Sequence, residues 1–250
     1  MIIKVGSRGS KLAQVQVQEV LKELRSFHPE IFFATTFFET TGDKDQLTSL
    51  RTLDKTDFFT KEIDEAQLKN HFRVSIHSAK DLPERLAKGL KRVALTSGKD
   101  SRDALVLRDT DTLYSLKENA LIACSSQRRE EAIKALRPDF VCTDIRGTIE
   151  KRLEVLFQGV VDGVVIAKAA LIRLQLEKLN HIILDCKAAH FQGRLAVIAR
   201  EDDQEMERLF SCIDKPVKKR LYLGLEKPNT KQDDLLVTHC PLIETKLLPQ

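Results

Sequence analysis

The sequence lacks the features that mark several common classes of protein. No stretch of its 250 residues approaches the ~20 consecutive apolar residues that a membrane-spanning helix needs. The first ten residues, MIIKVGSRGS, do not contain the long apolar run of a signal peptide. Low-complexity tracts and a basic arm are missing, and the formal net charge of +4 is too small to indicate nucleic-acid binding. We therefore expect a cytoplasmic protein that binds neither membrane nor nucleic acid.

Cysteines are few, and their spacing suggests no pairing. The five cysteines are odd in number and form no CxxC motif, so neither a disulfide scaffold nor a zinc site is indicated. No other metal-ligand spacing and no nucleophile–base pair stands out, and the sequence contains neither GK[ST] nor GxGxxG. We expect free thiols and no metal ion.

Short apolar segments alternate with amphipathic segments along the chain. Residues 2–5 and 31–38 predict strands, and between them apolar residues at three- and four-residue steps predict a helix from Lys11 that ends before Pro29. The alternation continues to residue 199, which favours an α/β fold with mainly parallel sheets. Polar, turn-rich segments at 96–103 and 187–194 are candidate crossovers between two lobes. Two lobes joined in this way would enclose a ligand cleft.

Three predicted strands are each followed by a loop that carries arginine. Ligands of open α/β sheets bind beyond the carboxyl ends of the strands, and arginines near a helix start favour an anion there. Each loop alone could be an ordinary surface turn, but together they predict a ligand with several carboxylates or phosphates. The loops contribute Arg8 and Ser10 from GSRGS, Ser125, Ser126, Arg128 and Arg129 from SSQRR, and Arg146 and Arg152 from DIRGTIEKR.

The segment VSIHSAKDLP at 74–83 places Lys80 beside Asp81 at the end of a predicted buried strand. A solvated lysine–aspartate pair is the plain interpretation. In an arginine-rich cleft, the Asp81 carboxylate would stay ionised, so it could stabilise a developing cation or move a proton. Lys80 would help to hold an anionic ligand. We expect His77 to pack or hydrogen-bond rather than to catalyse, and Ser78 could cap the next turn.

These segments occur in the order found in one known family. IKVGSRGSKLAQVQ, TTGDKD, FFTKEIDEA, VSIHSAKDLP, DSRDALVLR, SSQRREEAIKALRPD, DIRGTIEKRL and FQGRLAVIARED together resemble the porphobilinogen deaminases (hydroxymethylbilane synthases) over residues 2–216. The resemblance implies a transferase that joins four porphobilinogen units head to tail with loss of ammonia. The product, hydroxymethylbilane, would serve tetrapyrrole and haem biosynthesis. The resemblance also implies a monomer whose dipyrromethane cofactor is attached covalently through a cysteine.

The resemblance implies a role for each matching residue. Asp81 would contact pyrrole nitrogens, stabilise cationic intermediates and assist proton transfer, with Lys80 beside it. Two periplasmic-binding-protein-like lobes are implied, lobe one from 1–95 with 191–216 and lobe two from 96–190. The residues implied to hold carboxylates of cofactor or substrate, or to act in elongation, are Arg8, Ser10, Lys61, Ser78, Ser125, Ser126, Arg128, Arg129, Arg146, Arg152, Arg173 and Gln192.

Two segments depart from the family pattern. The loop before FFTKE has TLDKTDFF in place of a glycine- and lysine-rich stretch, with Thr56 beside Lys55 where a lysine is usual. The GGCQ-like motif of the small third domain is absent, and residues 217–250 form a short, atypical C-terminal region, so we expect this domain to be truncated or absent. Cys240, the one cysteine in this region, is then the candidate attachment site. Cys212 is expected in the core, and Cys124, beside the SSQRR loop, could face the cleft but is expected to be a small strand-end residue.

Two other functions remain open on the sequence. The same two lobes could form a non-catalytic module that binds a pyrrole or another polycarboxylate. The glycine–serine and helix-start loops alone would also fit an α/β enzyme that handles phosphate. A covalent cofactor would separate the deaminase from the binding module, because only the enzyme requires one.

Overall fold

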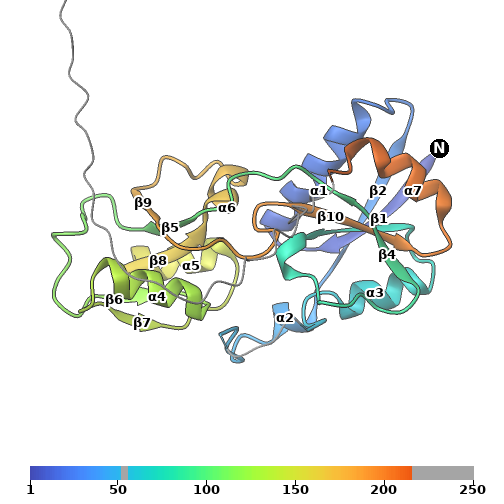
Figure 1. Ribbon diagram of the computed structural model, residues 1–250. Coiled ribbons are helices and arrows are strands. Elements are labelled where there is room, and N and C mark those ends of the chain that lie inside the picture. The colour runs from blue at the N-terminus through green and yellow to red at the C-terminus, as the bar shows by residue number, and fades with distance from the viewer. Residues whose placement is uncertain (52–55, 216–250) are drawn as a thin grey trace, which may run out of the picture. The chain divides into compact units, whose positions relative to one another are not determined.

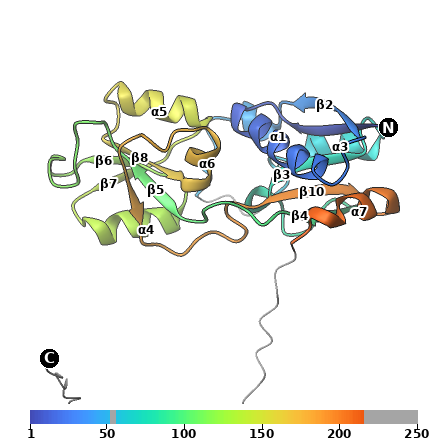
Figure 2. The same ribbon diagram turned by 90° about the horizontal axis from the view of Figure 1, so that it is seen from above.

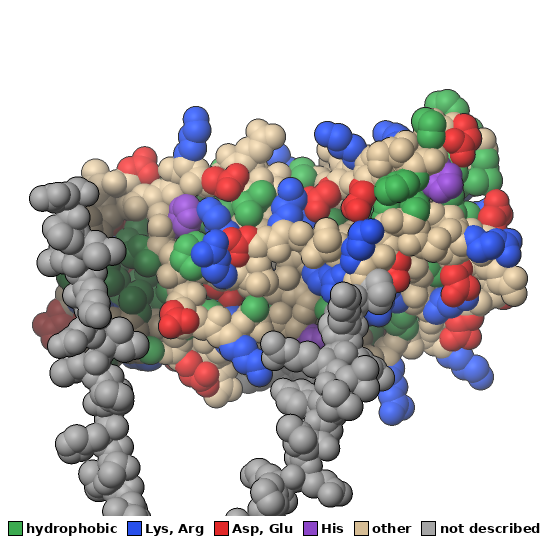
Figure 3. Space-filling model, turned by 45° about the horizontal axis from the view of Figure 1, so that its top comes forward, with side chains coloured by type: hydrophobic (Ala, Val, Ile, Leu, Met, Phe, Trp, Pro, Cys, Tyr) green, Lys and Arg blue, Asp and Glu red, His purple; other side chains and the backbone are tan. Residues whose placement is uncertain are grey.

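Two five-stranded sheets organise the chain, and the computed structural model describes residues 1–51 and 56–215 (Figure 1). Charged side chains of both signs are interspersed over the face seen in Figure 3, in keeping with the small net charge. Within the described ranges, no helix is both long enough and apolar enough to cross a membrane.

The first sheet has the strand order β2-β1-β3-β10-β4. Helices α1 and α7 bury their apolar faces against one side of it, and α3 covers the other side. The strands are β1 (Ile2–Arg8), β2 (Phe32–Phe38), β3 (Val74–Ser78), β4 (Leu90–Leu95) and β10 (Leu195–Arg200), and the helices are α1 (Lys11–Arg25), α2 (Thr41–Lys44), α3 (Lys61–Leu68) and α7 (Gln204–Phe210), with 3-10 turns η1 (Ala79–Asp81) and η2 (Ser211–Ile213).

The second sheet has the order β7-β6-β8-β5-β9. Helices α5 and α6 share a core cluster on one face, and α4 packs against the other. The strands are β5 (Asp103–Val106), β6 (Leu121–Ala123), β7 (Val141–Thr143), β8 (Gly163–Ala167) and β9 (His181–Leu184), and the helices are α4 (Gln127–Leu136), α5 (Ile149–Phe157) and α6 (Lys168–Arg173).

Each sheet contains one reversed strand. Strand β10 is antiparallel to both of its neighbours, β3 and β4, and β5 is antiparallel to both β8 and β9. The other paired strands, β1 with β2 and β3, and β6 with β7 and β8, are parallel. The prediction of an α/β fold is therefore confirmed, but the sheets are mixed, because four of the eight strand pairings are antiparallel. The reversed strands are the two that enter a sheet directly from a crossover.

The chain passes twice between the sheets, after β4 and after β9 (Figures 1 and 2). The two crossovers touch, since the Lys99 amide donates to the Gly193 carbonyl over 3.1 Å. Gly193 has φ +86°, and a Cβ there would lie 2.7 Å from the Lys99 carbonyl oxygen. Only glycine fits both this backbone conformation and this close approach.

Helix α1 shows why the local predictions succeed. Val17, Val20, Leu21 and Leu24 recur on one face and are all buried. The Ser10 hydroxyl accepts a hydrogen bond from the Ala13 amide over 3.3 Å, so Ser10 is the N-cap of the helix predicted from Lys11.

Two predictions need correction. The turn expected at residues 6–10 begins later, because β1 stays paired with β2 as far as Arg8 opposite Phe38. Strand β9 and helix α2 were not predicted. Periodicity alone does not distinguish a short apolar segment such as β9 from part of a helix, and α2 depends on a capping box between Thr40 and Asp43 rather than on an apolar face.

Candidate active site in the cleft

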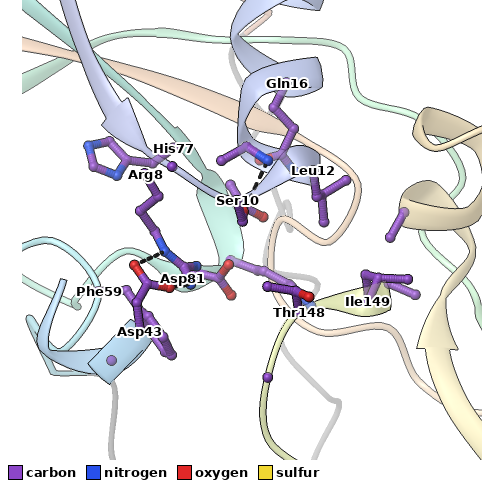
Figure 4. Close-up of a pocket in the computed structure, with 18 of the residues that line it drawn as sticks. Arg8, Ser10, Leu12, Gln16, Asp43, Phe59, His77, Asp81, Thr148 and Ile149 are labelled. Carbon is purple, nitrogen blue, oxygen red and sulfur yellow. Dashed lines mark hydrogen bonds and ion pairs between the residues drawn. The ribbon is translucent and has the colours of Figure 1, made fainter. Parts of the chain in front are cut away.

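A cavity of about 630 Å³ is lined by residues from both lobes. Figure 4 shows Arg8, Ser10 and Asp81 on one side of it, with Thr148 and Ile149 reaching in from the other. A smaller hollow of about 300 Å³ shares Asp81 with it. The predicted residues that line the larger cavity are Arg8, Ser10, Ser78, Lys80, Asp81, Ser125, Arg129, Arg146, Arg152, Arg173 and Gln192.

The remaining predicted residues lie elsewhere. Ser126 and Arg128 line the smaller hollow, as does Thr56. Lys61 lies exposed at the start of α3 and lines neither space. Cys240, Lys55 and the region 217–250 are outside the described residues.

Asp81 lies at the end of η1, directly after β3, and faces both spaces. Among the described residues, its carboxylate forms no hydrogen bond and no ion pair. Lys80 beside it is not paired with it either. Burial lowers the pKa of the Lys80 ammonium, and the positive charges of Arg129 and Arg152 act in the same direction against the attraction of Asp81. Asp81 thus presents to the cavity a carboxylate that no other described residue pairs with.

Arg8, at the end of β1, already has a carboxylate partner. Its Nε donates to Asp43 Oδ2 over 3.2 Å, its Nη2 pairs with Asp43 Oδ1, and the guanidinium lies 4.5 Å from the centre of the Phe59 ring (Figure 4). Burial raises the pKa of Asp43, but hydrogen bonds from Arg8 and Thr40 and the charge of Arg8 together hold this pKa below its usual value. Arg8 therefore faces the cavity as a member of an ion pair.

The two arginines of SSQRR share one buried carboxylate. Arg129 donates from Nη2 to Asp103 Oδ1 over 2.6 Å, and Arg128 donates from Nη1 to Asp103 Oδ2 over 2.5 Å. Arg128 also donates to the Gln192 amide oxygen over 3.2 Å. Gln192 in turn donates to the Ser101 carbonyl over 2.7 Å, which joins the arginine pair to both crossovers.

Arg146 and Arg152 bring positive charge that no protein carboxylate within the described ranges pairs with. Arg152 donates to the Gly147 carbonyl over 2.9 Å, and burial together with the charges of Arg129 and Arg146 lowers its pKa to about 10. Arg146 donates to two backbone carbonyls of the α2 region, while its buried Nε has no hydrogen-bond partner in the described part of the chain. The positive charge in this part of the cavity favours the binding of an anion.

Arg173 connects the two lobes. Its Nε and Nη2 each donate to the Glu19 carboxylate of α1 over 3.0 Å, and Nη2 donates to the Gly193 carbonyl over 2.8 Å. The side chain lines the cavity, yet these contacts occupy much of its hydrogen-bonding capacity. Its implied contact with substrate stays a prediction.

His77 is buried in β3, and no hydrogen-bond partner of its Nε2 lies within the described residues. It therefore packs, as expected, rather than hydrogen-bonding through this atom. Burial, assisted by the charge of Arg8, lowers its pKa from 6.5 to about 4, so the ring is neutral at physiological pH.

The burial of His77 should make the free energy of unfolding depend on pH. Between pH 6.5 and 4 the unfolded chain protonates His77 while the folded chain does not, so His77 lowers the free energy of unfolding as the pH falls. From pH 8 to pH 5 this contribution is about 2 kcal/mol. Burial raises the pKa of Asp64 to about 6, which acts in the opposite direction. Urea unfolding of wild type and His77→Leu should be measured at both pH values. The Asp64 contribution is the same in both proteins, so it cancels in the difference between them. Equal pH dependence in the two proteins would contradict the prediction.

Asp43, Phe59 and Asp103 were missed as site residues. All three lie inside the segments that carry the family resemblance, TTGDKD, FFTKEIDEA and DSRDALVLR. An acidic residue at the start of a strand, next to a crossover, was the available signal for Asp103. Without the fold, nothing in the spacing links it to arginines 25 and 26 positions away.

The described cysteines lie away from the cavity surfaces. Cys124 is fully buried, and Cys142, Cys186 and Cys212 are half-buried; none of the four lines either space. Cys212 packs against the core of the first sheet, as expected. Over residues 1–51 and 56–215, no group of three or more His, Cys, Asp or Glu side chains is arranged to hold a metal ion.

Comparison with known proteins identifies the family. The family model "Porphobilinogen deaminase, dipyromethane cofactor binding domain" matches residues 3–208. The chain belongs to the porphobilinogen deaminase family. It is 36% identical to the porphobilinogen deaminase of Streptococcus sanguinis over 219 residues, which cover 85% of this chain and 72% of that one. It is 38% identical to the Thermus thermophilus enzyme over 218 residues, covering 86% and 71%.

A solved structure supports the fold class alone. The crystal structure of CbnR, a LysR family transcriptional regulator, superposes with a TM-score of 0.51 at 10% identity, covering 84% of this chain and 67% of that one. Two periplasmic-binding-protein-like lobes are therefore common to proteins with unrelated chemistry. The function has to be argued from the residues of the cleft.

Proposed function

We propose that this deaminase-family chain is a transferase that joins porphobilinogen units head to tail, with loss of ammonia, to give hydroxymethylbilane. The observation that carries the proposal is the Asp81 carboxylate, which has no partner within residues 1–51 and 56–215 and lies at the junction of two spaces whose walls are rich in arginine. Each porphobilinogen unit is one pyrrole ring with two carboxylates, so a cleft for several joined units needs many cationic groups.

The residues of the cleft fit the dipyrromethane cofactor of this family. Two joined pyrrole rings bring four carboxylates. The cleft offers the Arg146 and Arg152 guanidiniums, and in the described part of the chain the Nε of Arg146 has no hydrogen-bond partner and Arg152 has no carboxylate partner. When bound, the cofactor supplies the pyrrole end to which the first substrate unit is joined. We propose that Arg146 and Arg152 hold carboxylates and that Ser125, Ser126 and Lys80 add hydrogen-bond donors.

Asp81 would act on the rings themselves. A carboxylate without a protein partner can accept hydrogen bonds from pyrrole N–H groups and stabilise positive charge that develops on the ring system. It can also take up or return the proton that is exchanged when a bond forms at the ring. Lys80 and Arg152, both partly desolvated, keep this carboxylate in a positive environment.

Attachment, location and assembly are proposals that rest on the family. We propose Cys240 as the cofactor's attachment site, because none of the described cysteines lines the cleft. We also propose that the chain works as a monomer in the cytoplasm on a small-molecule substrate.

Intact-protein mass spectrometry tests the proposed function. We expect the purified chain to carry the mass of one dipyrromethane and to gain whole pyrrole units on incubation with porphobilinogen. Peptide mapping then locates the adduct, with Cys240→Ser as the variant that should lack it and Cys212→Ser as the matched control. A chain that stays unmodified, even when supplied with preformed hydroxymethylbilane, would indicate a non-catalytic binding module instead.

A further inference from the structure

Asp103 is a fully buried carboxylate whose two oxygens are both used by cleft arginines. Oδ1 accepts from Arg129 Nε and Nη2 over 3.1 and 2.6 Å, and Oδ2 accepts from Arg128 Nη1 over 2.5 Å. Burial raises the pKa of Asp103, but the charges and hydrogen bonds of Arg129 and Arg128 outweigh it and hold this pKa below its usual value. Asp103 is therefore charged at neutral pH.

The reversed direction of β5 brings this carboxylate to the cleft. Because β5 is antiparallel to β8, its first residue, Asp103, lies opposite Ala167 at the carboxyl end of β8. Strand β6 runs parallel to β8, so its carboxyl end, where the SSQRR loop begins, lies at the same edge. If β5 ran parallel to β8, Asp103 would lie at the opposite edge of the sheet.

Asp103 is the acceptor that these two guanidiniums share. Among the described residues, it is the only carboxylate paired with either Arg128 or Arg129. Arg129 is only 5% exposed, so without Asp103 its charge would be buried with just the Val165 carbonyl and the Ser125 hydroxyl at 3.4 and 3.5 Å. Those long contacts would not fix the orientation of the group.

We propose that Asp103 is a positioning residue, which aims Arg128 and Arg129 at the carboxylates of the growing pyrrole chain. The proposal rests on the proposed function, since the ligand is the polycarboxylate that the family handles. Asp103 itself lines neither space, so it would not touch a ligand bound there. It acts through the two arginines.

A positioning role and a purely electrostatic role of Asp103 predict opposite changes in substrate binding when its charge is removed. Removal of the Asp103 charge leaves the cleft one unit more positive, so electrostatics alone would strengthen the binding of an anionic substrate. Loss of the shared acceptor would instead let the Arg129 guanidinium turn away and would leave Arg128 with the Lys187 carbonyl and the Gln192 amide oxygen as acceptors, over 2.8 and 3.2 Å, which weakens binding. A displacement of about 1 Å in such a group can cost on the order of 100-fold in rate.

The test uses Asp103→Asn, Asp103→Glu and the wild-type chain. Asparagine removes the charge at nearly constant shape, and glutamate keeps the charge but shifts the carboxylate by one methylene. We expect kcat/KM for porphobilinogen to fall at least ~10-fold in both variants, mainly through a higher KM. Calorimetric titration with porphobilinogen, with Asp81→Ala present in every chain to suppress turnover, should show the same loss of affinity. If Asp103→Asn does not fold, Asp103→Glu decides alone.

Asp162→Asn is the matched control. Asp162 is 7% exposed in the same lobe and pairs with Arg108 and Lys117, but it lines neither space. We expect Asp162→Asn to lower thermal stability without changing KM. A tighter KM in Asp103→Asn, or wild-type kinetics in Asp103→Glu, would overturn the positioning role. A wild-type chain that neither binds nor turns over porphobilinogen would overturn the proposed function, and the inference with it.

Discussion

Replacement of Asp81 by alanine should lower the turnover of porphobilinogen by at least ~10²–10³-fold, the loss typical when one electrostatic stabiliser is removed from an active site. The fold should survive, because the Asp81 carboxylate makes no hydrogen bond or ion pair with any described residue. The measurement is kcat by release of product, together with the melting temperature by circular dichroism. We expect the melting temperature to stay within a few degrees of wild type.

Two further variants separate the causes. Asp81→Asn keeps the shape and removes the charge, so it should lose nearly as much turnover as alanine if the charge is what matters. Asp43→Ala removes a carboxylate from the same cavity that is paired with Arg8 and Thr40, so it should lower stability as well as turnover. Wild-type turnover in Asp81→Ala would exclude Asp81 from the mechanism.

Replacement of Arg152 by methionine should weaken function while leaving stability unchanged or higher. Arg152 is a half-buried cation without a carboxylate partner in the described residues, and its lowered pKa, about 10, reflects the cost of partly desolvating that charge. A charge-assisted hydrogen bond to a substrate carboxylate contributes about 1.5–3 kcal/mol. We therefore expect KM for porphobilinogen to rise by about 10–100-fold.

Arg129→Met is the informative comparison for this variant. It removes an arginine from the same cleft, but it leaves the buried carboxylate of Asp103 with Arg128 as its remaining ion-pair partner. We expect Arg129→Met to lower the free energy of unfolding by about 3–5 kcal/mol and to impair binding. Urea unfolding of both variants checks the contrast. Equal destabilisation by the two substitutions would show that the charge of Arg152 is compensated by a group that the described contacts do not include.

Several features of the fold followed from local sequence. The repeat of Val17, Val20, Leu21 and Leu24 predicts α1, and Ser10 predicts its start, because capping and apolar periodicity depend on residues within one or two helical turns. Local residue patterns predicted the positions of most strands in the same way. Strand β9 and helix α2 were not predicted, because periodicity alone does not distinguish a short apolar segment such as β9 from part of a helix, and α2 depends on a capping box rather than on an apolar face.

The cleft was only partly predictable. The loops with Arg8, Arg129 and Arg146 were expected at strand ends, and all three residues line one cavity. Their counter-ions were not expected. The pairs Arg8–Asp43, Arg129–Asp103 and Arg173–Glu19 join residues 35, 26 and 154 positions apart, and no local pattern encodes such distances.

By itself, the sequence determined the alternation of strands and helices, the family, and the presence of arginine at several strand ends, because each depends on short-range patterns of residue type. The tertiary structure decided which of these charges are neutralised by the protein and which are left for a ligand. Asp103 pairs with two arginines only because β5 runs in reverse, while Asp81 and Arg152 face the cleft without an ion-pair partner among the described residues. The physical reason is that electrostatic pairing depends on distance in space, and strand direction sets that distance.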